Sequence, residues 1–179
     1  MSSLSHDMDV RVDATLSASV DTLVFAASDD ATVSVADVMT LNANDAAINA
    51  DGDFGLKAAG AASISSDSLS MNADKTLAVS AGEIATITTS ELELSASTSV
   101  ELLTAQLKVG STRSMEVFSA SSLDATTTDL IVSSFEDTTM SAGERATVTA
   151  ADVTLNAGDT LDVSADDTRV RNSGVVDVF

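Results

Sequence analysis

The stretch ATVTAADVTLNAGDTLDVSADD, residues 146–167, repeats one short phrase three times. In each phrase two apolar residues flank a polar one, an Ala follows two places on, and a break bearing Asp or Gly comes next. Successive side chains of a β-strand point to opposite faces, so this alternation is typical of a strand. A helix would instead place apolar residues three and four positions apart. We therefore expect three short strands in this stretch.

The same phrase recurs along nearly the whole chain with a fixed period. Successive segments start 7, 8 and 8 residues apart in rotation, so equivalent positions recur every 23 residues, except that the step from Ala85 to Leu107 is one residue short. The segment starts are residues 16, 23, 31, 39, 46, 54, 62, 69, 77, 85, 92, 100, 107, 115, 123, 130, 138, 146, 153 and 161. Such a period indicates a solenoid, because each coil must close and stack on the previous one.

The predicted fold is an all-β, triangular parallel β-helix formed by a single chain. Each coil has three strands, and about seven coils at ~4.8 Å each make a rod roughly 35 Å long. The first and third residues of a segment line the core. The fifth lies at a corner where two walls converge, which explains why it is almost always Ala, Ser or Thr. We expect the solenoid domain to span residues 8–179, without obvious caps, after an N-terminal arm of residues 1–7.

The apolar-x-apolar-x-Ala phrases of residues 146–165 resemble the C-terminal needle regions of phage tail-spike and type VI secretion spike proteins. The resemblance implies an intertwined trimeric β-helix, in which three identical chains each supply one strand per layer, and a role in a phage-like injection apparatus. The strict rotation of segment lengths favours the single-chain form. In an intertwined trimer, no rule would tie a segment to the third segment after it. The trimer is kept as the alternative.

Composition narrows the possible partners and the compartment. The net charge is −20, with 8 Lys and Arg against 28 Asp and Glu, which argues against nucleic acid as a partner. The chain has no Cys, so neither a disulfide framework nor a thiolate metal site is expected. No apolar run is long enough for a membrane span, and the N-terminus MSSLSHD lacks the pattern of a signal peptide. These features lean toward an intracellular location.

The chain shows no constellation typical of catalysis. The only His is His6, in the N-terminal arm, away from any Ser and Asp of the repeat that it could serve. The stretch Asp51-Gly52-Asp53-Phe54-Gly55 lacks the remaining ligands of a calcium loop, so we interpret it as a turn. The breaks between strands have only two or three residues, too few to wall a cleft. We expect no enzyme activity, no cofactor and no metal.

Three outward positions break the polar pattern of the strands: Leu103, Phe118 and Ile131. They lie on neighbouring segments, and we expect them to form a lateral contact with a protein partner, the alternative being scattered surface residues. Arg169 and Arg171 form a basic spot on the last coil. They either contact an acidic partner or balance the nearby aspartates.

The repeat runs almost to both ends, where open coils would expose core residues and unpaired backbone groups. We therefore expect partner contacts at Val176, Val178 and Phe179. The predicted function is a non-catalytic structural rod that stacks end to end or docks into a large filamentous assembly, for example of a cytoskeletal or ciliary type. A trimeric spike is the first alternative. An ice-binding protein is the second, because Thr86-Ile87-Thr88 and Thr147-Val148-Thr149 are Thr-x-Thr arrays, although they lie on different faces.

Overall fold

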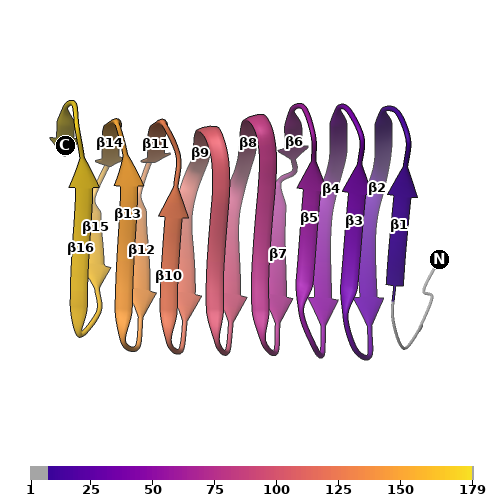
Figure 1. The fold of residues 1–179 in the computed structure, drawn as a ribbon, viewed down its shortest axis with the longest axis horizontal. Helices are drawn as coiled ribbons and strands as arrows, with labels where there is room; N and C mark the ends of the chain where they lie inside the picture. The colour runs from indigo at the N-terminus through magenta and orange to yellow at the C-terminus, as the bar shows by residue number, and fades with distance from the viewer. Residues whose placement is uncertain (1–7, 179) are drawn as a thin grey trace.

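The computed structural model describes residues 8–178, so the predicted arm 1–7, with His6, and the predicted contact Phe179 lie outside the described residues. Within that range the chain forms no helix and one 17-stranded sheet in which every pairing is parallel. Figure 1 shows the coils stacked side by side along the long axis, from β1 at one end to β16 at the other. The predicted all-β parallel solenoid is confirmed.

The strands follow one another with short breaks. Their bounds are β1 (Met8–Val12), β2 (Leu16–Ala27), β3 (Ala31–Val35), β4 (Met39–Ala50), β5 (Phe54–Ala58), β6 (Ala62–Ser65), β7 (Ser68–Ala73), β8 (Thr76–Ala96), β9 (Ser99–Ser119), β10 (Ser122–Thr126), β11 (Asp129–Ser134), β12 (Asp137–Ala142), β13 (Arg145–Ala150), β14 (Asp152–Ala157), β15 (Thr160–Ser164), β16 (Asp167–Asn172) and β17 (Val176–Val178). The long strands β2, β4, β8 and β9 bend around corners and so contribute to more than one wall.

Three walls follow from the pairing, and we call them faces A, B and C. Face A comprises β6, β11, β14, β17 and residues 16–20, 39–43, 84–89 and 106–111. Face B comprises β7, β12, β15 and residues 22–27, 45–50, 91–96 and 114–119. Face C comprises β1, β3, β5, β10, β13, β16 and residues 76–81 and 99–104. Each coil therefore passes through C, A and B in turn.

The register of the pairing is that of the sequence period. Met39 pairs with Ala62 and Ala62 with Ala85, each one coil of 23 residues further along the same chain. Between β8 and β9 the offset falls to 22, where Ala85 pairs with Leu107, as the sequence predicts. A second offset of 22 joins β13 to β16, where Arg145 pairs with Asp167. Every coil is thus closed and continued by one chain, rather than by three intertwined chains.

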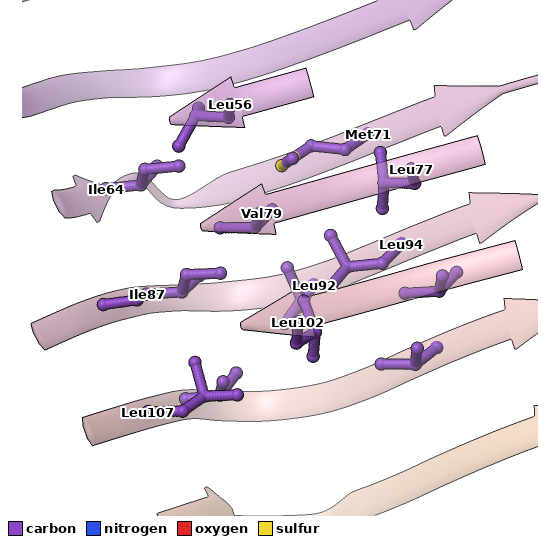
Figure 2. Close-up of a cluster of buried hydrophobic side chains, with 14 of the residues drawn as sticks. Leu56, Ile64, Met71, Leu77, Val79, Ile87, Leu92, Leu94, Leu102 and Leu107 are labelled. Carbon is purple, nitrogen blue, oxygen red and sulfur yellow. The ribbon is translucent and has the colours of Figure 1, made fainter. Parts of the chain in front are cut away.

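The core is a narrow column of aliphatic side chains. The first and third residues of each segment that the sequence defines point inward in the central coils and are buried, Leu77 and Val100 completely. Figure 2 shows such side chains, among them Leu56, Ile87 and Leu94, reaching toward the axis from different walls. Because each segment contributes only two large side chains and one small one, the column is filled by Leu, Ile, Val and Met with little need for aromatic residues.

The corners are closed by small side chains, several of which link successive coils. Ala96 and Ser119, both at the corner between faces B and C, are almost completely buried. At the corner between faces C and A, the Thr104 hydroxyl lies 3.2 Å from the carbonyl of Glu83 and 3.0 Å from that of Gln106. A corner hydroxyl can thus donate a hydrogen bond to a backbone carbonyl, so Ser and Thr can replace Ala in this buried position.

Aspartates at corners make a second set of links between coils. The backbone N–H of Asp53 donates to Oδ1 of Asp30 at 2.8 Å, and the N–H of Thr76 donates to Oδ1 of Asp53 at 3.0 Å. Each carboxylate therefore accepts a hydrogen bond from the coil that follows it. These contacts use the short polar side chain typical of turns, so Asp53 has a structural role here.

Some corners approach one another too closely for any side chain. A Cβ placed on Gly143 would overlap the carbonyl oxygen of Ala120, which lies one coil earlier at the same corner. Gly110, which lies within face A, is different, because the nearest atom to a Cβ there is Oγ of Ser133 at 3.8 Å. Glycine is required at Gly143 by the spacing of coils, and it is not required at Gly110.

We predict that Gly143→Ala lowers the free energy of unfolding by about 1–3 kcal/mol, because the added methyl forces neighbouring coils apart. The matched variant Gly110→Ala is expected to be neutral or stabilising by up to about 1 kcal/mol, since Gly weakens a strand. Urea unfolding followed by circular dichroism compares the two. Equal stability of the two variants would show that the corners are not packed this tightly.

Candidate protein interface

The coil formed by β15, β16 and β17 presents inner side chains that other coils bury. Val176 is 45% exposed, whereas Val153, which pairs with it in the preceding coil, is 2% exposed. Val178, at the next inward position of β17, is 58% exposed. The predicted contacts Val176 and Val178 are therefore part of an apolar surface at this end of the described solenoid, together with the edge of β17.

The coil at the other end of the described chain is also incompletely covered. The inward residues Val10 and Leu16 are only partly buried, as are Leu23 and Phe25 on face B. Their counterparts one coil later are buried: Val33 beside Val10 and Met39 beside Leu16. Both end coils thus combine apolar inner residues with a strand edge that pairs on one side only.

The two predicted basic contacts lie on the outer surface of β16. Arg169 Nη2 lies 2.6 Å from Oδ2 of Asp167, so this arginine balances a neighbouring aspartate. Arg171 points outward beside Thr149 and contributes to a hollow of about 370 Å³ with Thr127 and Ser173. Both arginines are exposed, and a contact of either with a partner stays a prediction.

The structure exposes Leu103, Phe118 and Ile131 but does not bring them together. Leu103 lies on face C, where it pairs with Ser80 and Thr126. Phe118 lies on face B and Ile131 on face A. The three residues point away from three different walls, so the single lateral patch expected for them does not form on any one face. The error lies in treating neighbouring segments as one surface, since successive segments occupy successive walls.

The sequence analysis missed five exposed large apolar residues, of which Phe135 and Val170 are the most informative. Phe135, the most exposed large apolar side chain of the described residues at 77%, lies at the corner between faces A and B. Val170 lies on β16 between the two arginines and is 51% exposed. Phe135 could have been noticed as an aromatic at a corner, a position otherwise held by small or polar residues. The exposure of Val170 could have been predicted by asking which inward-facing residues are not covered by a following coil.

Electrostatic contacts are few and lie on the surface. The described ion pairs join Arg11 to Asp9, Arg113 to Glu91, Arg145 to Asp124 and Arg169 to Asp167. All eight side chains are at least about a third exposed to solvent, where such a pair contributes only about 0–1 kcal/mol. The pairs therefore offset little of the repulsion that a net charge of −20 produces.

Residues 8–178 contain no group of three or more His, Cys, Asp and Glu side chains placed to hold a metal. A helix long and apolar enough to cross a membrane is likewise not found in this range. The Thr-x-Thr arrays lie apart: Thr86 and Thr88 are on face A, and Thr147 and Thr149 are on face C.

No protein-family model matches this chain, and neither curated proteins nor solved structures give a significant match. Function is therefore inferred from the surfaces of the chain itself.

We predict that added NaCl raises the melting temperature. Raising the ionic strength from about 10 mM to about 150 mM shortens the Debye length from ~30 Å to ~8 Å, which screens repulsion among carboxylates across the rod. The exposed ion pairs are weakened too, but they contribute less. Differential scanning calorimetry at constant pH measures the effect, and a lower melting temperature in salt would show that the ion pairs dominate.

Proposed function

We propose that this chain is a non-catalytic structural rod that associates with protein partners through the edges of its end coils. The observation that carries the proposal is the exposure of Val170, Val176 and Val178, inward-facing residues whose counterparts in the central coils are buried. A further coil, from a second copy or from another β-solenoid, would cover them and pair with the exposed strand edge. Stacking end to end would extend the rod into a filament.

The proposal is supported by the uniformity of the coil-to-coil interface. Every internal coil meets the next through parallel backbone pairing and the same inward residues, so one edge of a coil is complementary to the opposite edge of another. An exposed edge of this kind is a template for strand addition, which supplies affinity through main-chain hydrogen bonds. The walls between the ends carry mainly short polar side chains, which suit spacing and solubility.

The energies favour weak, concentration-dependent association. Burying a whole Val side chain contributes roughly 1.5–3 kcal/mol, and the end valines are already half-buried. Association costs about 4–15 kcal/mol in lost freedom before any contact is counted. Strand pairing and inner residues from both ends must therefore act together, and the net charge of −20 opposes close approach at low salt.

We predict that the chain associates as its concentration rises and that the double variant Val176→Lys/Val178→Lys stays monomeric. Both side chains are exposed, so the fold tolerates lysine, whereas a covering coil would bury two unpaired charges. The control is Thr154→Lys/Asn156→Lys, which adds the same charge on outward positions of β14. Sedimentation velocity over a concentration series measures both. A monodisperse monomer throughout, or equal loss of association in both variants, would contradict the proposal.

A further inference from the structure

The two ends of the described solenoid match each other in register. At one end β16 pairs only with β13 and β17 only with β14, and at the other β1 pairs only with β3 and residues 16–20 only with β4. Following the pairing from coil to coil makes Thr168 the equivalent of Met8 on face C. It likewise makes Val176 the equivalent of Leu16 on face A. The free edge of the last coil is therefore one that the first coil of a second copy would continue.

The corner between faces C and A supports this match independently. From the first inward position of face C to that of face A, the chain advances eight residues in each of the first four coils. It advances only seven in the next three, as from Ala146 to Val153. In the last coil the step returns to eight, from Thr168 to Val176. The last coil thus has the corner length of the first coil, so faces C and A of a second copy can be in register together.

Stacking of this kind would cover apolar side chains from both ends. On face C, Val170 would lie beside Val10 of the second copy, and on face A, Val176 would lie beside its Leu16. Val170 is 51% and Val176 45% exposed, and Val10 and Leu16 are only partly buried. The contact therefore joins apolar residues on two walls of the rod.

The outer surface of face C carries charges that suit the same contact. Arg169 and Arg171 are two of the eight Lys and Arg residues of the chain, and Arg171 makes no ion pair within the described residues. The register places Arg169 beside Asp9 of the second copy. Arg171 lies beside Arg11 of that copy, with the carboxylates of Asp9 and Asp13 on either side of it along the chain. The arginines of the last coil thus meet a strand that is net acidic.

We infer that the partner of the coil formed by β15, β16 and β17 is a second copy of this chain, joined head to tail. In this junction β16 pairs with β1, and β17 pairs with residues 16–20, of the second copy. The inference rests on the proposed function, because it names the partner of the end-coil surfaces. Every pairing in the described sheet is parallel, and only head-to-tail stacking continues that sense. Such a heterologous contact leaves the same edge free at each new end and gives an open filament.

Face B limits the strength of this junction. Each coil passes through faces C, A and B in turn, and the described strands run from β1 on face C to β17 on face A. With faces C and A in register, β15 and residues 22–27 of the second copy lie two coils apart and do not pair. Two of the three walls therefore supply main-chain hydrogen bonds, in keeping with weak association.

The test is disulfide formation between separate full-length chains, which have no Cys of their own. Asp177 would lie beside Ser17 of the second copy, and both residues are exposed. Paired Cα atoms are about 4.8 Å apart, within the range of a disulfide. Oxidation of Asp177→Cys chains mixed with Ser17→Cys chains should give dimers that contain one of each, whereas either variant alone should give none. Non-reducing electrophoresis and mass spectrometry identify the products.

A matched control is Thr154→Cys, on the same wall one coil further from the end. It should give no dimer with Ser17→Cys, so dimers formed by random collision are recognised.

Charge reversal tests the contact on face C. Arg169→Glu and Asp9→Lys should each weaken association about two- to fivefold, because each places like charges beside one another. The double variant Asp9→Lys/Arg169→Glu restores opposite charges at every junction and should recover most of the lost affinity. Arg113→Glu makes the same charge change in the middle of the rod and should have less effect. Sedimentation velocity measures association, and the melting temperature of each variant checks its fold.

The outcomes separate this inference from the proposed function. Dimers of Asp177→Cys alone would indicate tail-to-tail contact, and dimers of Ser17→Cys alone head-to-head contact. Either result, or association that Val176→Lys/Val178→Lys abolishes but that gives no mixed dimer, overturns the inference and leaves the proposed function standing. An unaltered chain that stays monomeric at every concentration contradicts both.

Discussion

Parallel backbone pairing between residues one coil apart is the interaction on which the rest of this structure depends. It places each residue beside its equivalents in the neighbouring coils, so any property of one position is repeated along the rod. Inward positions become a continuous apolar column, outward positions become flat walls, and corner positions become stacks of small residues. The same pairing leaves one backbone edge and a few inner side chains uncovered wherever the stack stops, as at Val176 and Val178.

Repetition also explains how much of the fold could be predicted from the sequence. A period of 23 residues with alternating polarity specifies which residues face inward, and Leu77, Leu102 and Val148 are buried as that alternation requires. The shortened step from Ala85 to Leu107 could also be predicted from the sequence, because the alternation places Leu107 inward one residue earlier than the period of 23 would. The second shortened step, from Arg145 to Asp167, was not recognised from the sequence.

The candidate surfaces were harder to predict because they depend on which residues lie close together in space, and the period alone does not give this. Leu103, Phe118 and Ile131 are close in sequence order but occupy three walls, so proximity along the chain did not mean proximity in space. Whether a corner hydroxyl finds a carbonyl, as Thr89 does and Ser66 does not, is decided by side-chain geometry that no alternation pattern contains.

The central claim, that one chain closes every coil at this register, can be tested directly because the chain has no Cys. Ser63 and Thr86 are paired on the outer side of face A, so their Cα atoms lie about 4.8 Å apart, within the range that a disulfide spans. Oxidation of the double variant Ser63→Cys/Thr86→Cys, followed by non-reducing electrophoresis and mass spectrometry, gives the answer. The single-chain register predicts an intramolecular disulfide in a monomer. Disulfide-linked dimers and trimers, without the intramolecular bond, would contradict it and indicate intertwined chains.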